Sequence, residues 1–266
     1  MATTRPMVSD TACGYYIEAL ERFEQAGIPF LVGGAYAYSR YAKIERETKD
    51  FDVFVRPADA PRVLALFEGL GCQTELTFPH WLGKVRFGAH FIDVIFSSGN
   101  GVARVDDLWF EHAVAADVLG RPMWLSPPEE MIWSKAFVQE RERYDGADVI
   151  HLLRELGPTL DWPRLLMRFD HRWRVLLSFI VLFGFVYPDQ RQQVPLWVQE
   201  ELIGRLQNEG LDPDNRVCNG TVLSREQYLN DLERFGYRDA RVEPHGQMSE
   251  AEIEVWTNAI GDKSQQ

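Results

Sequence analysis

The sequence predicts an α+β protein, in which a mixed β-sheet with helices on one face is followed by a mostly helical region. Before Ser126, short apolar runs typical of strands alternate with segments of helical periodicity. After Pro128 the pattern is almost purely helical, with no strand-like alternation between the segments. We therefore expect an N-terminal domain of residues 1–126 and a helical C-terminal domain of residues 127–266.

Turn-forming residues limit the expected N-terminal elements. Gly27, with Pro29 just beyond it, stops the first helix, and Pro57 closes an apolar strand. In chain order we expect helix 9–26, strand 30–32, helix 35–41, strand 50–55, helix 61–70, and two strand pairs, 84–87 with 91–96 and 115–118 with 123–125. This order predicts the mixed sheet.

After the boundary, the periodicity predicts helices at residues 129–141, 145–156, 163–187 and 195–207. The run from Val175 to Tyr187 is apolar on every side, which predicts a helix buried in the C-terminal domain. Residues 224–227 and 249–252 both match the capping-box pattern that opens a helix. Residues 262–266 are expected to form a frayed end.

Composition excludes several classes of protein. The 266-residue chain is 45% apolar and 12% aromatic, as in an ordinary packed protein. Its three cysteines are too few and too scattered for a disulfide framework or structural zinc. The start of the chain has no signal-peptide pattern, and the longest apolar run is shorter than the roughly 18 residues that a membrane span requires. We therefore expect a cytoplasmic protein with no membrane association.

The formal net charge of −12 argues against broad electrostatic binding of nucleic acid. One local basic feature stands out, a row of Arg164, Arg168 and Arg172 at helical spacing. Such a row either binds a phosphate backbone or an acidic partner, or is a solvated face paired with acids. The sequence favours the second interpretation, because 40 acidic residues are available as partners.

The strongest chemical signal is a set of three aspartates near a pair of glycines. Asp50 and Asp52 lie in one strand and point to the same face, roughly 7 Å apart along the backbone. Asp93 lies inside a later apolar strand, where an ionised carboxylate is costly unless a cation compensates it. Oxygen ligands without His or Cys favour Mg²⁺, or Mn²⁺, over zinc. Gly33-Gly34, between a strand and a helix, leaves the backbone open to a phosphate.

Each of these features has an ordinary explanation when taken alone. A Gly-Gly pair is commonly a turn, and an Asp-x-Asp pair is commonly a solvated strand end. The aspartate within an apolar strand is harder to explain in this way, although an edge strand would leave it solvated. The combination, in this order and on these elements, favours a functional site. Gly33-Gly34 lacks the Gly-Lys-Ser/Thr continuation of a P-loop, which argues against a P-loop kinase.

In these residues the sequence resembles the DNA-polymerase-β-like nucleotidyltransferase superfamily. The matching segments are Leu31-Val32-Gly33-Gly34-Ala35-Tyr36-Ala37, then Arg46-Glu47-Thr48-Lys49-Asp50-Phe51-Asp52, then Ile92-Asp93-Val94. Within this superfamily, the sequence most resembles the AbiEii-type toxin and the lincosamide and aminoglycoside nucleotidyltransferases. A Pro-Glu-Glu segment at residues 128–130, with Lys135, Arg141, Asp145 and Asp148 after it, extends the resemblance to about residue 156. Many relatives carry Ser where this chain has Gly34.

The resemblance implies a role for each matching residue. Gly33 and Gly34 would hold the triphosphate of a nucleoside triphosphate (NTP), and Asp50 and Asp52 would ligate two metal ions. Asp93 would ligate the catalytic metal and orient or deprotonate the attacking hydroxyl. Lys135 would neutralise phosphate charge, and Asp148 would position Lys135 or the acceptor. Asp145 and Asp148, three residues apart on one predicted helix, are also compatible with capping or a solvated face, and Lys135 with a solvated one.

Arg46 and Lys49, just before the Asp-x-Asp pair, either contact the nucleotide phosphates or keep a loop soluble. These expectations describe an enzyme that moves a nucleoside monophosphate from an NTP to an acceptor hydroxyl and releases pyrophosphate. The acceptor is left open between a small molecule such as an antibiotic, an RNA end and a protein. The alternative is an inactive member of the fold that binds a nucleotide or a protein partner, for example in a toxin–antitoxin pair.

Overall fold

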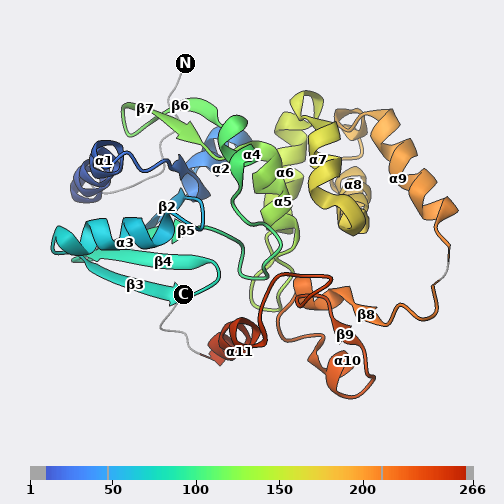
Figure 1. Ribbon diagram of the computed structural model, residues 1–266. Coiled ribbons are helices and arrows are strands. Elements are labelled where there is room, and N and C mark those ends of the chain that lie inside the picture. Colours follow the sequence, from blue (N-terminus) through green and yellow to red (C-terminus); the bar gives the residue numbers. More distant parts are fainter. Residues whose placement is uncertain (1–9, 47, 211, 262–266) are drawn as a thin grey trace. The chain divides into compact units, whose positions relative to one another are not determined.

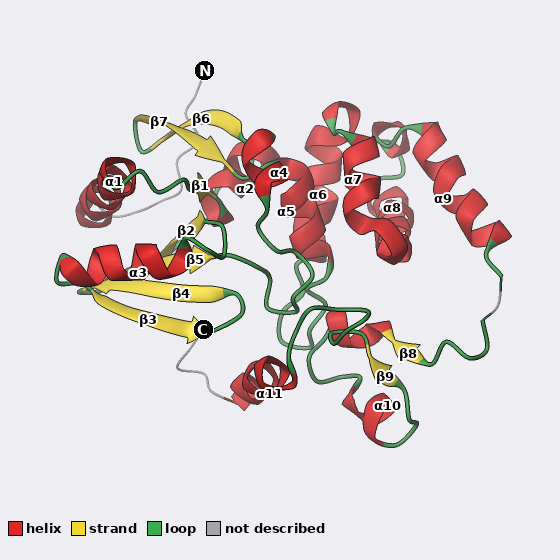
Figure 2. Cartoon of the chain, viewed as in Figure 1, coloured by secondary structure: helices red, strands yellow, loops and turns green. Residues whose placement is uncertain are grey.

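The computed structural model describes residues 10–46, 48–210 and 212–261, so the expected frayed end lies outside the described residues (Figure 1). The chain divides into two compact units, residues 1–127 and residues 128–266. Most of the strands belong to the first unit and most of the helices to the second (Figure 2).

A seven-stranded mixed sheet forms the centre of the N-terminal unit, with the strand order β3-β4-β5-β2-β1-β7-β6. Its strands are β1 (Leu31–Val32), β2 (Asp50–Phe54), β3 (Gln73–Phe78), β4 (Leu82–Phe87), β5 (His90–Ile95), β6 (Val114–Val118) and β7 (Arg121–Leu125). The β2–β5 and β1–β7 pairs are parallel, and the other neighbours are antiparallel. The predicted α+β class with a mixed sheet is therefore confirmed.

Helices α1 (Asp10–Gln25) and α3 (Ala60–Gly69) cover one face of the sheet. Tyr16 of α1 stacks on Phe51, with 4.9 Å between the ring centroids, and Leu64 of α3 lies against Gly83. Because side chains alternate along a strand, Phe51 and Gly83 face these helices, and the residues next to them in sequence point to the other face. Helix α2 (Gly34–Ala42) follows β1, and α4 (Asp107–Glu111) places Trp109 against Phe54, at 5.0 Å between ring centroids. The face opposite α1 and α3 is the one that carries the aspartates.

Strand β3 is absent from the expected elements. Its sequence, Gln-Thr-Glu-Leu-Thr-Phe, is mostly polar, and half of its residues are exposed because it forms the edge of the sheet. The strand forms through its pairing with β4, and no clear apolar alternation in the sequence predicts it.

The C-terminal unit is built from helices α5 (Pro128–Ala136), α6 (Gly146–Leu156), α7 (Trp162–Phe169), α8 (Trp173–Val186), α9 (Leu196–Asn208), α10 (Leu229–Glu233) and α11 (Glu250–Asn258). A short parallel pair, β8 (Val217–Cys218) and β9 (Arg238–Asp239), accompanies them. The capping box at Ser249 is present as predicted. The one expected at Ser224 is wrong, because residues 225–228 form turns and α10 begins only at Leu229.

The single helix expected over residues 163–187 is broken. Asp170 has a positive φ of 43°, and residues 170–172 form a 3₁₀ turn between α7 and α8. Arg172 therefore does not continue the row of Arg164 and Arg168 along one helix.

The basic row is also buried and is not a surface platform. The Arg164 guanidinium pairs with Glu129 and, at 2.5 Å, with Glu130, and Arg168 reaches Glu130 at 3.0 Å. The two arginine side chains are 8% and 7% exposed. The prediction of a solvated face paired with acids is therefore right about the acidic partners, but it is wrong about the exposure of the arginine side chains.

The prediction of an entirely buried apolar helix is wrong for α8. Leu176, Phe179 and Phe183 are buried, but Val181 is 66% exposed and Phe185 82% exposed. An apolar sequence on all sides does not ensure that neighbours cover all sides. None of the described helices is both long enough and apolar enough to cross a bilayer.

Candidate active site

The Gly33-Gly34 turn is fixed against strand β2. Strand β1 runs antiparallel to β2, and the Gly33 amide donates a hydrogen bond to the Asp52 carbonyl at 3.0 Å. Helix α2 begins at Gly34, so the open backbone of this turn stands at a helix N-terminus. Such a turn can present amide groups to an anion.

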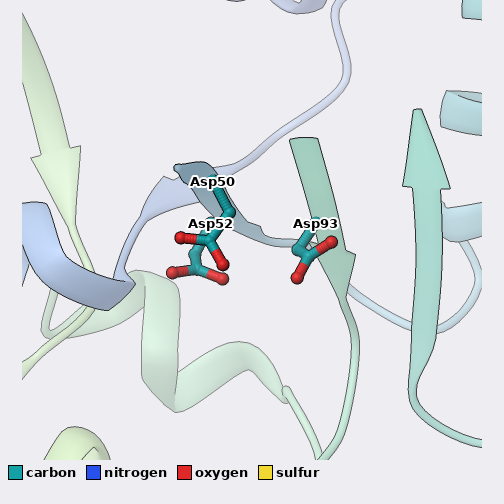
Figure 3. A group of neighbouring side chains, drawn as sticks. All are labelled: Asp50, Asp52 and Asp93. Atoms are coloured by element: carbon teal, nitrogen blue, oxygen red, sulfur yellow. The ribbon is translucent and has the colours of Figure 1, made fainter. Parts of the chain in front are cut away.

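Strand register brings the three aspartates together. Asp52 and Asp93 are direct partners on the parallel strands β2 and β5, and Asp50 lies two residues before Asp52 on the same face. One carboxylate oxygen from each residue lies within 4.8 Å of the other two. Figure 3 shows the three side chains on the same side of the two strands.

Two contacts at the start of β2 hold Asp50 in place. The Thr48 hydroxyl donates to the Asp50 carboxylate at 2.5 Å. The Tyr16 hydroxyl donates to the Lys49 carbonyl at 3.3 Å, which joins α1 to the start of β2. Burial, and then the charges of the three aspartates, raise the pKa of Tyr16 to about 12, so its hydroxyl stays protonated and can donate.

Lys84 is the cationic neighbour of Asp93. The two residues are paired on strands β4 and β5, with 3.4 Å between the Lys84 Nζ and the Asp93 Oδ1. Their side chains are 8% and 14% exposed. Burial raises the pKa of Asp93 to about 6, Lys84 partly opposes this, and Asp50 adds to it. The fold thus holds a carboxylate in a place where its charge is incompletely compensated.

Gly34 is required by the position of Asp52. The residue has a φ of +52°, and an added Cβ would lie 1.6 Å from the Asp52 Oδ2. A Cβ on Gly33 would lie 2.0 Å from the Phe54 ring. The serine that many relatives carry at position 34 is therefore incompatible with this arrangement of Asp52 unless the carboxylate moves.

The residues present fit a divalent cation. Three carboxylates offer hard oxygen ligands, and the buried Asp93 Oδ1 makes no close hydrogen bond in the described structure, with the Lys84 Nζ 3.4 Å away. A cation there would ligate an oxygen that the protein leaves unsatisfied.

Arg46 and Lys49 precede β2 and have exposed side chains. The Arg46 guanidinium stacks over the Tyr38 ring, 4.2 Å from its centroid, and this contact anchors it to α2. Lys49 contributes its backbone carbonyl to Tyr16. Both residues therefore border the start of the strand that carries Asp50.

Lys135 and Asp148 lie in the other compact unit, residues 128–266. The Lys135 ammonium stands 3.0 Å from Asp145 and 2.8 Å from Asp148. Arg143 also pairs with Asp145, at 2.9 Å. Burial opposes ionisation of Asp145, but Lys135 and Arg143 hold the pKa of that carboxyl well below its usual range. Lys135 is thus half-enclosed by two acids, and the interpretation as a freely solvated lysine is wrong.

Sequence reasoning missed Lys84, Thr48 and Tyr16 as neighbours of the site. The sequence did contain a signal for Lys84, because this charged residue lies within the strand that precedes the strand of Asp93. Recognising it required the register of β4 against β5.

The structure thus has the mixed sheet, the Gly-Gly turn and the three clustered carboxylates that the resemblance to nucleotidyltransferases implies. Residues 9–182 match the model of a family described as an uncharacterised nucleotidyltransferase, and the chain belongs to this family. No curated protein matches the chain.

Several solved structures are similar at low identity. The antibiotic-resistance factor ANT(2″)-Ia in solution shares 14% identity over 75% of this chain and 95% of its own, with a TM-score of 0.40. The lincosamide antibiotic adenylyltransferase LnuA, bound to lincomycin, shares 16% identity over 55% of this chain and 96% of its own, with a TM-score of 0.39. An antigenic nucleotidyltransferase-like protein from Paracoccidioides brasiliensis shares 14% identity over 65% of this chain and 93% of its own, with a TM-score of 0.36.

Proposed function

We propose that this protein is a divalent-metal-dependent nucleotidyltransferase that moves a nucleoside monophosphate from an NTP to an acceptor hydroxyl. The observation that carries the proposal is the convergence of Asp50, Asp52 and Asp93 within 4.8 Å, beside a Gly-Gly turn at a helix N-terminus. Membership of the nucleotidyltransferase family supports the reaction class.

Each residue has a task in this reaction. Asp50, Asp52 and Asp93 would hold the divalent metal, which is Mg²⁺ or Mn²⁺ by the hardness of the ligands. The bound metal supplies charge neutralisation for the triphosphate and for the transition state. Gly33 and Gly34 present the backbone to the phosphates of the NTP, with Arg46 and Lys49 beside them as further phosphate ligands.

The bonds exchanged are one at the acceptor and one at the nucleotide. The acceptor hydroxyl oxygen forms a bond to the α-phosphorus of the NTP, and the bond from that phosphorus to the bridging oxygen of the β-phosphate breaks. Pyrophosphate leaves with the bond's electron pair. Asp93 orients the hydroxyl and accepts its proton. The tasks expected of Lys135 and Asp148, which lie in the other compact unit, stay predictions.

The test is transfer of label from each α-labelled NTP, with Mg²⁺, to a cell extract that contains RNA, protein and small molecules. We expect one acceptor class to become labelled and pyrophosphate to be released. Asp50→Asn, Asp52→Asn and Asp93→Asn should each abolish both signals. Asp117→Asn is the matched control, because Asp117 is an exposed acid near the end of β6 in the same unit, where its carboxylate accepts a hydrogen bond from the Gly120 amide.

Magnesium-dependent NTP binding, with no pyrophosphate released in the presence of any acceptor, would indicate an inactive, nucleotide-binding member of the family. Transfer that persists in all three aspartate variants would contradict the proposed site.

A further inference from the structure

The site face of the sheet carries its functional groups in a row from one strand to the next. Gly33 at the end of β1 bonds to Asp52 on β2, Asp52 pairs with Asp93 on β5, and Asp93 pairs with Lys84 on β4. The sheet order β4-β5-β2-β1 therefore runs from a cationic end to the glycine turn, with the carboxylates in between.

Strand β4 contributes a second cation to the same face. Arg86 is two residues beyond Lys84 and pairs with Phe91, which in turn pairs with Asp50. The Lys84 ammonium and the Arg86 guanidinium lie 4.9 Å and 5.6 Å from the centroid of the Phe91 ring. Both side chains therefore lie on the aspartate side of the sheet, while α3 covers the opposite face at Gly83.

The two cations differ in what they can still bind. Lys84 is buried and its charge faces Asp93. Arg86 is exposed, and no described carboxylate lies within ion-pair distance of it. On the neighbouring strand β3, Glu75 is in register with Lys84, whereas the neutral Gln73 is in register with Arg86. Arg86 thus offers a planar, charged donor to a ligand on this side of the carboxylates.

The direction of attack decides which ligand meets Arg86. In an in-line displacement, the attacking oxygen and the leaving pyrophosphate stand on opposite sides of the α-phosphorus. If the triphosphate lies at Gly33-Gly34, beside β1, the acceptor approaches over β5 and β4. This step rests on the proposed function.

We propose that the acceptor is anionic: a hydroxyl compound that carries a phosphate group, which Arg86 binds beside the attacking hydroxyl. A guanidinium binds phosphate through two parallel charge-assisted hydrogen bonds, whereas it repels an ammonium group. A polycationic acceptor, which the overall charge of −12 would attract, would meet the exposed Arg86 guanidinium on this side of the carboxylates. The phosphate can belong to a nucleic acid end or to a small phosphorylated molecule.

Equilibrium binding tests this without requiring turnover. The probes are a fluorescein-labelled single-stranded oligoribonucleotide with a free 3′-hydroxyl, adenosine 5′-monophosphate, and tobramycin as the cationic compound, each with Mg²⁺ and a non-hydrolysable NTP analogue. We expect one of the two phosphate-bearing probes to bind and tobramycin not to compete. Binding of the oligonucleotide alone identifies a polymer end, and binding of the mononucleotide identifies a small acceptor.

Arg86→Glu should weaken that binding about tenfold or more, and Arg86→Lys should retain part of it. In the transfer assay, Arg86→Glu should raise the KM for the acceptor and leave the KM for the NTP nearly unchanged. Arg62→Glu is the matched control, since Arg62 is an exposed arginine of the same unit on α3, across the sheet.

Preferential binding or labelling of tobramycin, equal binding in wild type and Arg86→Glu, or no binding of either phosphate-bearing probe would overturn the inference. The proposed function is judged separately, because it depends on Mg²⁺-dependent NTP binding and on pyrophosphate release with any acceptor. An active enzyme that uses only neutral or cationic acceptors would refute the anionic acceptor and leave nucleotidyl transfer intact.

Discussion

The carboxylate of Asp52 occupies the space that a side chain on residue 34 would need. A Cβ at Gly34 would lie 1.6 Å from the Asp52 Oδ2, and the residue also has a left-handed φ of +52°. The glycine turn and the Asp-x-Asp strand are therefore one structural unit, in which the phosphate cradle and the metal ligands constrain each other.

Gly34→Ala should abolish activity by displacing Asp52, with kcat/KM lowered about 100-fold or more. The backbone strain alone costs about 1–2 kcal/mol. Gly71→Ala separates the two effects, because Gly71 has a φ of +84° but nothing within 4 Å of an added Cβ. We expect similar losses of stability from strain in both variants and a loss of activity only in Gly34→Ala. Equal activity in the two variants would show that the contact with Asp52 is unimportant.

Asp93 should make the stability of the metal-free protein depend on pH in an unusual direction. Burial raises its pKa from 3.8 to about 6, with Lys84 opposing the rise only in part. Between these values the folded state binds more protons than the unfolded state, so this contribution to stability falls as the pH rises through the window from about 4 to 6. In chelator at pH 8, Asp93→Asn should therefore be more stable than wild type by on the order of 3 kcal/mol.

Urea unfolding of both proteins at pH 8 and near pH 4 checks this prediction. The advantage of Asp93→Asn should shrink toward the lower pH, where the wild-type carboxyl is neutral. Added Mg²⁺ at pH 8 should stabilise only the wild type. A difference that is the same at both pH values would mean that Asp93 is not held in a charge-unfavourable environment.

Lys135→Met should destabilise the region around α5 and α6. The substitution leaves the buried Asp148 without the cation that it shares with the half-buried Asp145, which still pairs with Arg143, and this costs about 3 kcal/mol at neutral pH. Because the pKa of Asp145 is held low, this stabilisation is present above its ordinary pKa and is lost only as the pH falls through its lowered value. Faster amide hydrogen exchange in residues 146–156 at pH 7 would report it. Unchanged exchange would mean that the pairs contribute no stability.

The buried arginines should behave differently from a surface arginine. Arg164→Leu removes the partner of Glu129 and Glu130 and should lower the free energy of unfolding by about 3–5 kcal/mol. Arg174→Ala, which breaks an exposed pair with Glu209, should cost about 0–1 kcal/mol. Denaturant titration of the two variants makes the comparison, and equal losses would contradict the buried assignment.

Local sequence signals predicted the parts of the fold that depend on neighbours in the chain. Apolar strands and glycine stops located β1, β2 and β5, and strand alternation placed Asp50 and Asp52 on one face. The break at Asp170 was invisible because neither Gly nor Pro marks it, and the polar edge strand β3 forms only through its pairing with β4.

Long-range pairing explains the remaining differences. The arginine row was expected to be a solvated face, and its burial could not be predicted because its partners, Glu129 and Glu130, lie more than 30 residues earlier in the chain. Lys84 went unnoticed because its relation to Asp93 exists only in the register of two strands. Exposure of Val181 and Phe185 likewise depends on which helices pack against α8.

In the proposed enzyme, the three aspartates bind a divalent cation as one site. Titration of the protein with Mn²⁺, followed by the loss of the free-ion electron paramagnetic resonance signal, tests it most directly. We expect binding in wild type and Asp117→Asn, weakened about tenfold or more in each of Asp50→Asn, Asp52→Asn and Asp93→Asn. Equal Mn²⁺ binding in all five proteins, or none in wild type even with an NTP analogue, would show that these carboxylates do not form a metal site.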